Sequence, residues 1–262
     1  MKNILAASFC CLVFSTCTVP TLFAQDAWGH LKGMVQATGE LPEIDREEIN
    51  KDVESCLVGK VAPLDDNLVV GKDGGLRDVF VMMYLKDEEV PIHPSYEETK
   101  DKPVVLDNKN CRFKPHAIFL RVGQPLHLKN SDKVGHNCHG KFFNNGFNVN
   151  VPQDDVVKLK LSDKEKVPGL IVCDFHPWMD SVALVREEPY VAITNEKGEF
   201  EIKNIPAGKW KFQFWHRKGG YLRKLEIPGH KVGRRGEIEI DIESDKTLDL
   251  GKMTIDGKAL NK

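Results

Sequence analysis

Residues 171–185 read IVCDFHPWMDSVALV, and this stretch places a thiol, an imidazole and a thioether on one short loop. Cys173, His176 and Met179 follow one another at intervals of three residues, between two runs rich in Val, Ile and Leu. Such runs are typical of β-strands. The stretch therefore predicts a turn between two strands that carries three side chains able to bind a metal.

The same β-type pattern extends outward through the rest of the chain. Apolar runs are short, rich in Val, Ile and Phe, and separated by Gly, Pro, Asn or Asp; examples are DVFVMMYL (78–85), AIFLRVG (117–123), WKFQFWH (210–216) and GEIEIDIE (236–243). This pattern predicts an all-β protein of strands and tight turns. The exception is LPEIDREEINKDVESC (41–56), where Asp45 with Glu48 three residues later favours a short helix.

The first residues have the layout of an export signal. Lys2, an apolar run and the small residue Ala24 predict a cleaved signal peptide over residues 1–24. A lipid anchor at Cys17 is the alternative, but the preceding residues match such sites poorly. No later segment is long and apolar enough for a membrane anchor, so we expect a periplasmic or secreted protein.

The charge and the cysteine content of the exported chain argue against nucleic-acid binding and in favour of disulfide bonds. Loss of Lys2 leaves 36 basic side chains against 39 acidic ones, a net charge of about −3 with neutral histidines. Without a basic stripe interleaved with aromatic residues, nucleic-acid binding is not expected. Of seven cysteines, Cys56, Cys111, Cys138 and Cys173 remain after cleavage, and an oxidising compartment favours disulfides among them.

Two stretches on either side of the central loop share a second pattern. LKGMVQATGELP (31–42) with LRDVFVMMYL (76–85), and AITNEKGEFEIKNIPAGKWKFQFWH (192–216), resemble the carboxypeptidase-regulatory or transthyretin-like β-sandwich. The turns at Gly198, Pro206 and Gly208 agree with this on physical grounds. If residues 25–102 and 188–262 form one sandwich, residues 103–187 are a domain inserted into it.

The proposed insert has its own resemblance. CRFKPHAIFLRVGQPLHLKNSDKVGHNCHG (111–140) and VVKLKLSDKEKVPGLIVCDFHPWMDSVALV (156–185) resemble the cupredoxins, Greek-key β proteins that hold one copper ion, and most closely the amicyanin-like members with a short ligand loop. The resemblance implies that His136 joins Cys173, His176 and Met179 as the copper ligands. It also implies that Asn137 ties its strand to the thiolate loop by hydrogen bonds.

The donor types support this interpretation independently. One thiolate, two imidazoles and a weak thioether suit both oxidation states of a mononuclear copper. Zinc gains little from the methionine, and calcium or magnesium would require oxygen ligands. Alone, a strand cysteine or a methionine is usually core filler; their coincidence with His176 makes metal binding the stronger interpretation.

The other histidines and Cys138 have alternative roles. His139 is either an exposed strand residue or a neighbour of the metal, His116 is expected to cap a turn, and His216 to be structural or on the surface. Cys138 shares a strand face with His136, so it is a buried bystander, a further ligand or a disulfide partner.

The leading functional hypothesis is non-enzymatic: single-electron transfer between an unidentified donor protein and acceptor protein. Four protein ligands leave no open position for a substrate. One alternative is a carbohydrate- or protein-binding sandwich with structural or absent copper, because a fold alone fixes no activity. Another is a copper carrier with an exchangeable site.

Two structural predictions remain. We expect Cys56 to pair with Cys111, with Cys111–Cys138 as the competing disulfide. The cupredoxin resemblance implies that His176 reaches the surface as the exit ligand for electrons. Phe175, Pro177 and Trp178 then form either an apolar docking face around it or a seam with the sandwich half.

Overall fold

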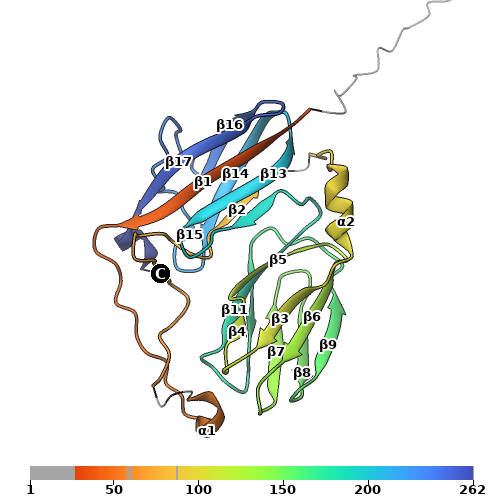
Figure 1. The fold of residues 1–262 in the computed structure, drawn as a ribbon, viewed down its shortest axis with the longest axis vertical. Coiled ribbons are helices and arrows are strands. Elements are labelled where there is room, and N and C mark those ends of the chain that lie inside the picture. Colours follow the sequence, from red (N-terminus) through yellow and green to blue (C-terminus); the bar gives the residue numbers. More distant parts are fainter. Residues whose placement is uncertain (1–26, 58, 60, 87, 262) are drawn as a thin grey trace, which may run out of the picture.

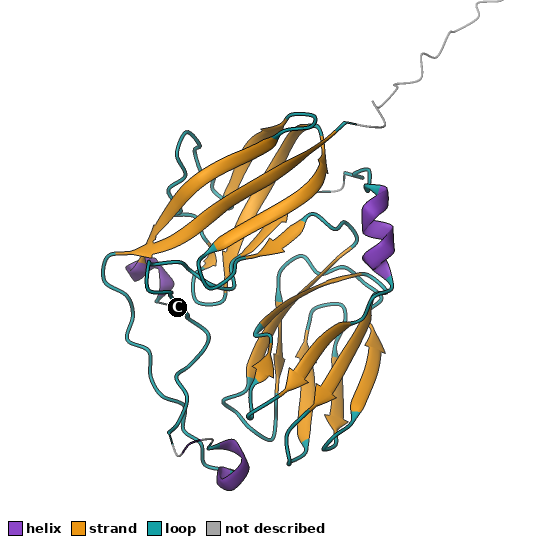
Figure 2. Ribbon diagram, in the orientation of Figure 1, coloured by secondary structure: helices purple, strands orange, loops and turns teal. Residues whose placement is uncertain are grey.

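The computed structural model describes residues 27–57, 59, 61–86 and 88–261. Strands and loops make up nearly all of it (Figure 2), so the all-β prediction is confirmed. The expected signal peptide of residues 1–24, with Cys17, lies outside the described residues. Among the described helices, none is both long and apolar enough to cross a membrane.

The first and last parts of the chain together form one module of two sheets, here called the sandwich module. Its strands are β1 (Trp28–Thr38), β2 (Phe80–Met83), β12 (Val191–Ile193), β13 (Glu199–Pro206), β14 (Gly208–His216), β15 (Gly220–Tyr221), β16 (Glu237–Ile242) and β17 (Thr247–Asp256). One sheet has the order β13-β1-β17 and the other β12-β2-β14-β15, with β16 also paired to β14. The short helix η3 (Gly257–Leu260) follows β17.

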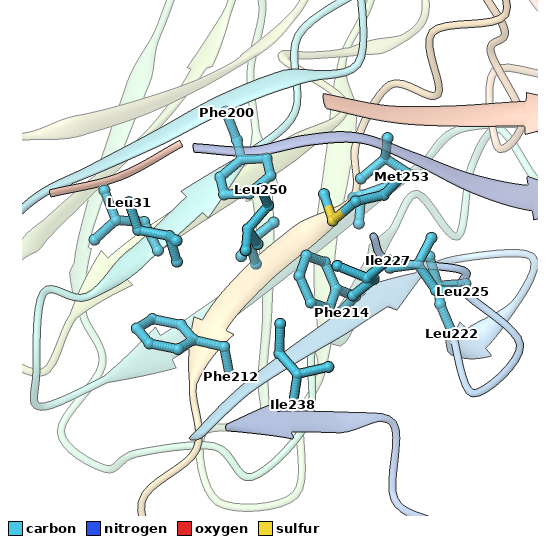
Figure 3. Packing of buried hydrophobic residues seen from close by; sticks show 14 of the residues in the cluster. Leu31, Phe200, Phe212, Phe214, Leu222, Leu225, Ile227, Ile238, Leu250 and Met253 are labelled. Carbon is cyan, nitrogen blue, oxygen red and sulfur yellow. The ribbon is translucent and has the colours of Figure 1, made fainter. Parts of the chain in front are cut away.

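The core of the sandwich module follows directly from alternating side chains. In β16 the three isoleucines, Ile238, Ile240 and Ile242, are buried, while the acidic residues between them lie toward solvent. Figure 3 shows how Phe200, Phe212 and neighbouring aliphatic side chains fill the space between the two sheets. Strands with this alternation therefore contribute one apolar face to a shared core.

The middle of the chain forms a second two-sheet body, here called the inserted module (Figure 1). Its strands are β3 (Val104–Asn108), β4 (Phe113–Lys114), β5 (Ala117–Arg121), β6 (Pro125–Asn130), β7 (His136–Lys141), β8 (Phe147–Val151), β9 (Val156–Lys160), β10 (Gly169–Val172) and β11 (Asp180–Arg186). The sheets have the orders β5-β11-β10-β7-β8 and β4-β3-β6-β9. Short helices η2 (Pro94–Tyr96) and α2 (Glu97–Lys100) precede the module.

An apolar seam joins the two modules. Phe80 and Met82 of β2 pack against strands β5 and β11 through Ala117, Val182 and Leu184. The alternate positions of β2 face the sandwich core. Because both faces of β2 are covered, its sequence is continuously apolar.

A long segment between β1 and β2, residues 39–67, leaves the sandwich module and returns to it; we call it the strap. Backbone hydrogen bonds from Glu47 to Pro63 and from Asp65 to Asp45 join its two legs. Its far end carries helix α1 (Val53–Cys56), visible at the tip of the strap in Figure 1. The disulfide Cys56–Cys111 ties this tip to the inserted module, as predicted.

The helix expected from Asp45 and Glu48 is wrong in extent. Described residues 45–50 have no helical turn, and the helix covers only Val53–Cys56. The reason is that Asp45 and Glu47 use their backbone groups to pair with the returning leg, which an α-helix at the same residues would prevent.

Candidate metal centre

The loop between β10 and β11 is folded tightly by its own backbone. The N–H of Cys173 donates to the carbonyl of Met179 at 3.1 Å, and the N–H of Met179 donates to the carbonyl of His176 at 2.9 Å. Strands β10 and β11 pair antiparallel on either side. The loop therefore brings three potential ligands to one end of the inserted module.

The fourth predicted ligand comes from the neighbouring strand. His136 is the first residue of β7, which pairs with β10. Its Nδ1 lies 3.0 Å from Nδ1 of His176, and Nδ1 of His176 lies 3.6 Å from Sγ of Cys173. One ligand atom from each of these three residues, a nitrogen from each histidine and the cysteine sulfur, lies within 4.8 Å of the other two. We call this group the His-Cys-His cluster.

Met179 and Asn137 lie around the cluster. The Met179 side chain is fully buried and packs in the same apolar cluster as Cys173 and Trp178. The backbone N–H of Asn137 points to Sγ of Cys173 at 3.4 Å, while its side-chain oxygen accepts from the N–H of Asp174 at 3.0 Å. Asn137 thus makes the contacts between β7 and the thiolate loop that the resemblance implies.

Each imidazole of the cluster is held from its outer side by a carboxylate. Nε2 of His136 donates to Asp132 at 2.9 Å, and Nε2 of His176 donates to Asp52 of the strap at 2.9 Å. Such contacts fix the tautomer and leave Nδ1 available for a metal. Asp132 also accepts from the backbone N–H of Cys111 at 2.8 Å, which links the disulfide turn to the cluster.

The electrostatics of the cluster favour a thiolate. Burial raises the pKa of Cys173, but the imidazoles of His136 and His176 beside its sulfur and the N–H of Asn137 outweigh burial and lower the pKa to about 6. Burial lowers the pKa of His136, but the Asp132 carboxylate and the Cys173 sulfur raise it overall. Because the thiolate is the form that binds metals, Cys173 is ready to ligate at neutral pH.

The buried donor set limits what this centre can hold. One thiolate and two imidazole nitrogens suit a transition metal such as copper or zinc, whereas magnesium and calcium prefer oxygen. A second group of potential ligands, Cys111 with Asp132 and His136, overlaps the cluster. Cys111 is consumed in the disulfide, so this second group is not a site.

The other histidines and Cys138 are placed as follows. Cys138 is fully buried, and burial raises the pKa of its thiol to about 12; it is free and belongs to none of the ligand groups found among the described residues. His139 is partly exposed and pairs with Asp174 at 3.0 Å. His216 is buried, in agreement with a structural role.

Two expectations about histidines are wrong. His176 is fully buried rather than exposed, because the strap covers it through Asp52. His116 does not cap a turn; it is buried between the two modules beside Asp78 and Asp180.

The expected apolar docking face is also incorrect in part. Trp178 is buried, and its indole N–H donates to the carbonyl of Cys111 at 3.1 Å, within the inserted module. It therefore lines neither a docking face nor a seam with the sandwich module. Phe175 and Pro177 do reach the surface, where the ammonium of Lys51 lies 5.1 Å from the centre of the Phe175 ring.

Asp52 and Asp132 are site residues that sequence reasoning missed. Asp132 lies four residues before His136, a spacing that could have drawn attention to it. Asp52 lies 124 residues away from its histidine, and no local pattern reveals that contact.

Comparisons with known proteins give matches only to solved structures. No family model and no curated protein matches the chain. A mutant of amicyanin in its reduced Cu(I) form at pH 4 aligns with 40% of this chain and 98% of its own, at 16% identity and a TM-score of 0.30. A purple cupredoxin from Nitrosopumilus maritimus covers 32% of this chain and 99% of its own, at 22% identity and a TM-score of 0.28. A copper-containing nitrite reductase from Thermus scotoductus SA-01 covers 40% of this chain and 25% of its own, at 14% identity and a TM-score of 0.31.

Proposed function

We propose that this chain is an exported mononuclear copper protein that transfers single electrons between redox partners. His136, Cys173, His176 and Met179 hold the copper in this proposal. The observation that carries it is the buried His-Cys-His cluster, with a fully buried methionine closing the same loop. Copper bound by such ligands exchanges one electron without large rearrangement.

The cluster fits copper in the chemistry of its donors. Sulfur ligands favour the reduced ion and imidazoles suit the oxidised one, and both are present. Zinc would use the thiolate and imidazoles but gains little from a thioether. Asp52 and Asp132 leave the two Nδ1 atoms facing inward, as metal-binding histidines require.

The domain assignment is part of the same proposal. Residues 103–187 form a cupredoxin-type module, and residues 25–102 with 188–262 form an accessory sandwich of the carboxypeptidase-regulatory type. Support comes from strand pairing, since β1 pairs with β13 and β17 from the end of the chain. Within the described residues, strands β3 to β11 pair only among themselves.

The groups that cover His176 favour electron transfer over catalysis and over copper delivery. Asp52 contacts the outer nitrogen of this histidine, and the Trp178 ring lies 5.1 Å from the imidazole centre. With both groups against it, the His176 side chain has no exposed surface for a substrate or a copper acceptor to contact. A covered site supports retention of the metal while electrons pass through the protein.

Export is supported by the disulfide. The Cys56–Cys111 bond joins residues far apart in the chain, and such bonds persist mainly in oxidising compartments. The disulfide thus supports the part of the proposal that locates the protein in a periplasm or outside the cell.

The visible spectrum of the copper-loaded protein tests the proposal. Thiolate-to-copper charge transfer should give an intense blue or green colour that Cys173→Ser abolishes. Cys138→Ser is the matched control, since it changes a buried thiol outside the cluster and should retain the colour. Survival of the colour in Cys173→Ser, or a colourless copper-loaded native protein, would refute the assignment.

Retention of copper is tested separately. An electron carrier keeps its metal through reversible reduction and oxidation, even with a Cu(I) chelator present. Rapid loss of Cu(I) to the chelator would instead identify a copper carrier.

A further inference from the structure

A second group of metal-ligating side chains lies where the strap meets both modules. Asp66 belongs to the strap, His116 directly precedes β5, and Asp180 begins β11. Nε2 of His116 lies 3.7 Å from Oδ1 of Asp180 and 4.0 Å from Oδ1 of Asp66. The three ligand atoms fall within 4.8 Å of one another.

His116 is the feature that requires explanation. Its side chain is only 2% exposed, and its Nε2 has no hydrogen-bond partner within the described part of the chain. Distances of 3.7 and 4.0 Å to the carboxylates are too long for hydrogen bonds. A buried polar atom without a partner costs free energy, so this nitrogen is available to a further partner.

The spacing of the three atoms is suited to a shared cation. Bonds of about 2.0–2.2 Å from nitrogen and carboxylate oxygen to one ion place the ligand atoms roughly 3–4 Å apart. The opposite ring nitrogen of His116, Nδ1, lies 3.0 Å from Oδ2 of Asp78. A carboxylate behind the imidazole is the arrangement found around metal-bound histidines.

We propose that Asp66, His116 and Asp180 form a second metal site for a divalent cation such as zinc, with Asp78 orienting the imidazole. One imidazole and two carboxylates are a donor set that zinc accepts. The set lacks a thiolate, so its chemistry differs from that of the His-Cys-His cluster. Bound there, the cation would fasten the strap to the inserted module, while Asp78 adds a contact from the sandwich module.

Neighbouring cations oppose this site and limit its affinity. Arg112 and Lys114 contact the two oxygens of Asp66 at 3.0 and 3.1 Å. Arg217 contacts Oδ2 of Asp180 at 3.4 Å, and Arg77 contacts Asp78 at 3.0 Å. Oδ1 of Asp180, which faces His116, is left to the cation.

A proton competes with the proposed cation for Nε2 of His116. Burial lowers the pKa of His116, but Asp180, Asp78 and Asp66 outweigh it and raise the pKa to about 9. A cation at this site must therefore compete with a proton for Nε2.

The test uses the full chain with Cys173→Ser, which removes the thiolate of the first centre. Titration of the metal-free protein with zinc should show one zinc per chain, a rise in melting temperature and a ligand shell of nitrogen and oxygen by X-ray absorption. Adding His116→Gln or Asp66→Asn should weaken zinc binding at least tenfold. Adding Asp249→Asn, which removes an exposed carboxylate of the sandwich module, should not.

Four outcomes would overturn the proposal. The first is no zinc uptake by the Cys173→Ser protein, and the second is a sulfur atom in the zinc shell. The third is a zinc affinity in the added His116→Gln and Asp66→Asn variants that equals the affinity of the Cys173→Ser parent. The number of imidazoles in the X-ray absorption spectrum decides between the two sites without a further substitution, even if His116→Gln fails to fold. One imidazole per zinc is expected at the Asp66, His116 and Asp180 site, whereas zinc bound by His136 and His176 would show two, which is the fourth outcome that would overturn the proposal. None of these outcomes bears on the colour of the first centre.

Discussion

Asp52 accepts a hydrogen bond of 2.9 Å from His176 across 124 residues of sequence, and the histidine it contacts has no exposed surface. The contact comes from the strap, which the disulfide holds against the inserted module. A residue outside the inserted module therefore sets the environment of a proposed copper ligand.

Asp52→Ala should weaken retention of copper. Loss of a carboxylate behind a metal-bound histidine typically reduces metal affinity by roughly 10- to 100-fold, and Asp52 also shields the histidine. Competition with a Cu(I) chelator measures the change. Glu54→Gln removes an exposed negative charge from the same strap and should leave the affinity as it was; equal affinity in both variants would show that Asp52 does not position His176.

Trp178→Lys should destabilise the fold by several kcal/mol, because it places a charge at a buried position and removes the hydrogen bond to Cys111. Unfolding in urea gives the free energy. Phe175→Lys, at an exposed position of the same loop, is expected to change stability by less than about 1 kcal/mol. A fully stable Trp178→Lys protein would mean that the indole lies outside.

Replacing both Cys56 and Cys111 by serine should lower stability by about 4 kcal/mol from chain entropy alone, since the bond spans 55 residues. The strap should also open more often, which hydrogen exchange at the amides of Glu47 and Asp65 reports, because these amides join its two legs. Unchanged exchange would show that the strap is held without the disulfide.

Stability should fall with acid through His216. Burial lowers the pKa of this histidine from 6.5 to about 4, so the unfolded chain takes up a proton that the folded protein refuses. The neutral, buried His216 therefore contributes up to about 3 kcal/mol to the free energy of unfolding. This contribution is complete above pH 6.5 and is lost as the pH falls toward 4.

The matched comparison is between two histidine-to-asparagine changes. His216→Asn keeps an acceptor near the Nδ1 position, which receives the N–H of Lys218, and it should flatten the acid slope of the unfolding free energy. His127→Asn, at a partly exposed position of β6, should retain the slope. Identical slopes in both variants would assign the acid sensitivity to other groups.

The strands and the loop that carries the proposed ligands were predictable because their signals are local. The alternation in β16 is visible as EIEIDI, and Cys173, His176 and Met179 lie within one turn. The Cys56–Cys111 bond was also predicted correctly, from its turn-type surroundings. In each case the deciding residues are close together in the sequence or chemically distinctive.

The cover on His176 was not predictable because it depends on where the strap returns. The sequence around Asp45 favours a helix, yet pairing with the other leg overrides that preference. Similarly, the residues next to His116 predict a turn, whereas in the folded chain His116 lies beside Asp78, Asp66 and Asp180. Contacts between polar segments that lie far apart in the chain produce no periodic pattern in the sequence, so the sequence does not predict them.

Strand β1 lies in the middle of its sheet, and both of its neighbours, β13 and β17, come from the last quarter of the chain. During synthesis both edges of β1 therefore remain unpaired until β13 and β17 have been made, and unpaired strand edges promote aggregation. The inserted module, whose strands pair among themselves, can fold meanwhile. Once residue 111 is available, the Cys56–Cys111 bond can fasten the strap, so the segment that follows β1 is tethered to the first part of the inserted module before β13 and β17 emerge.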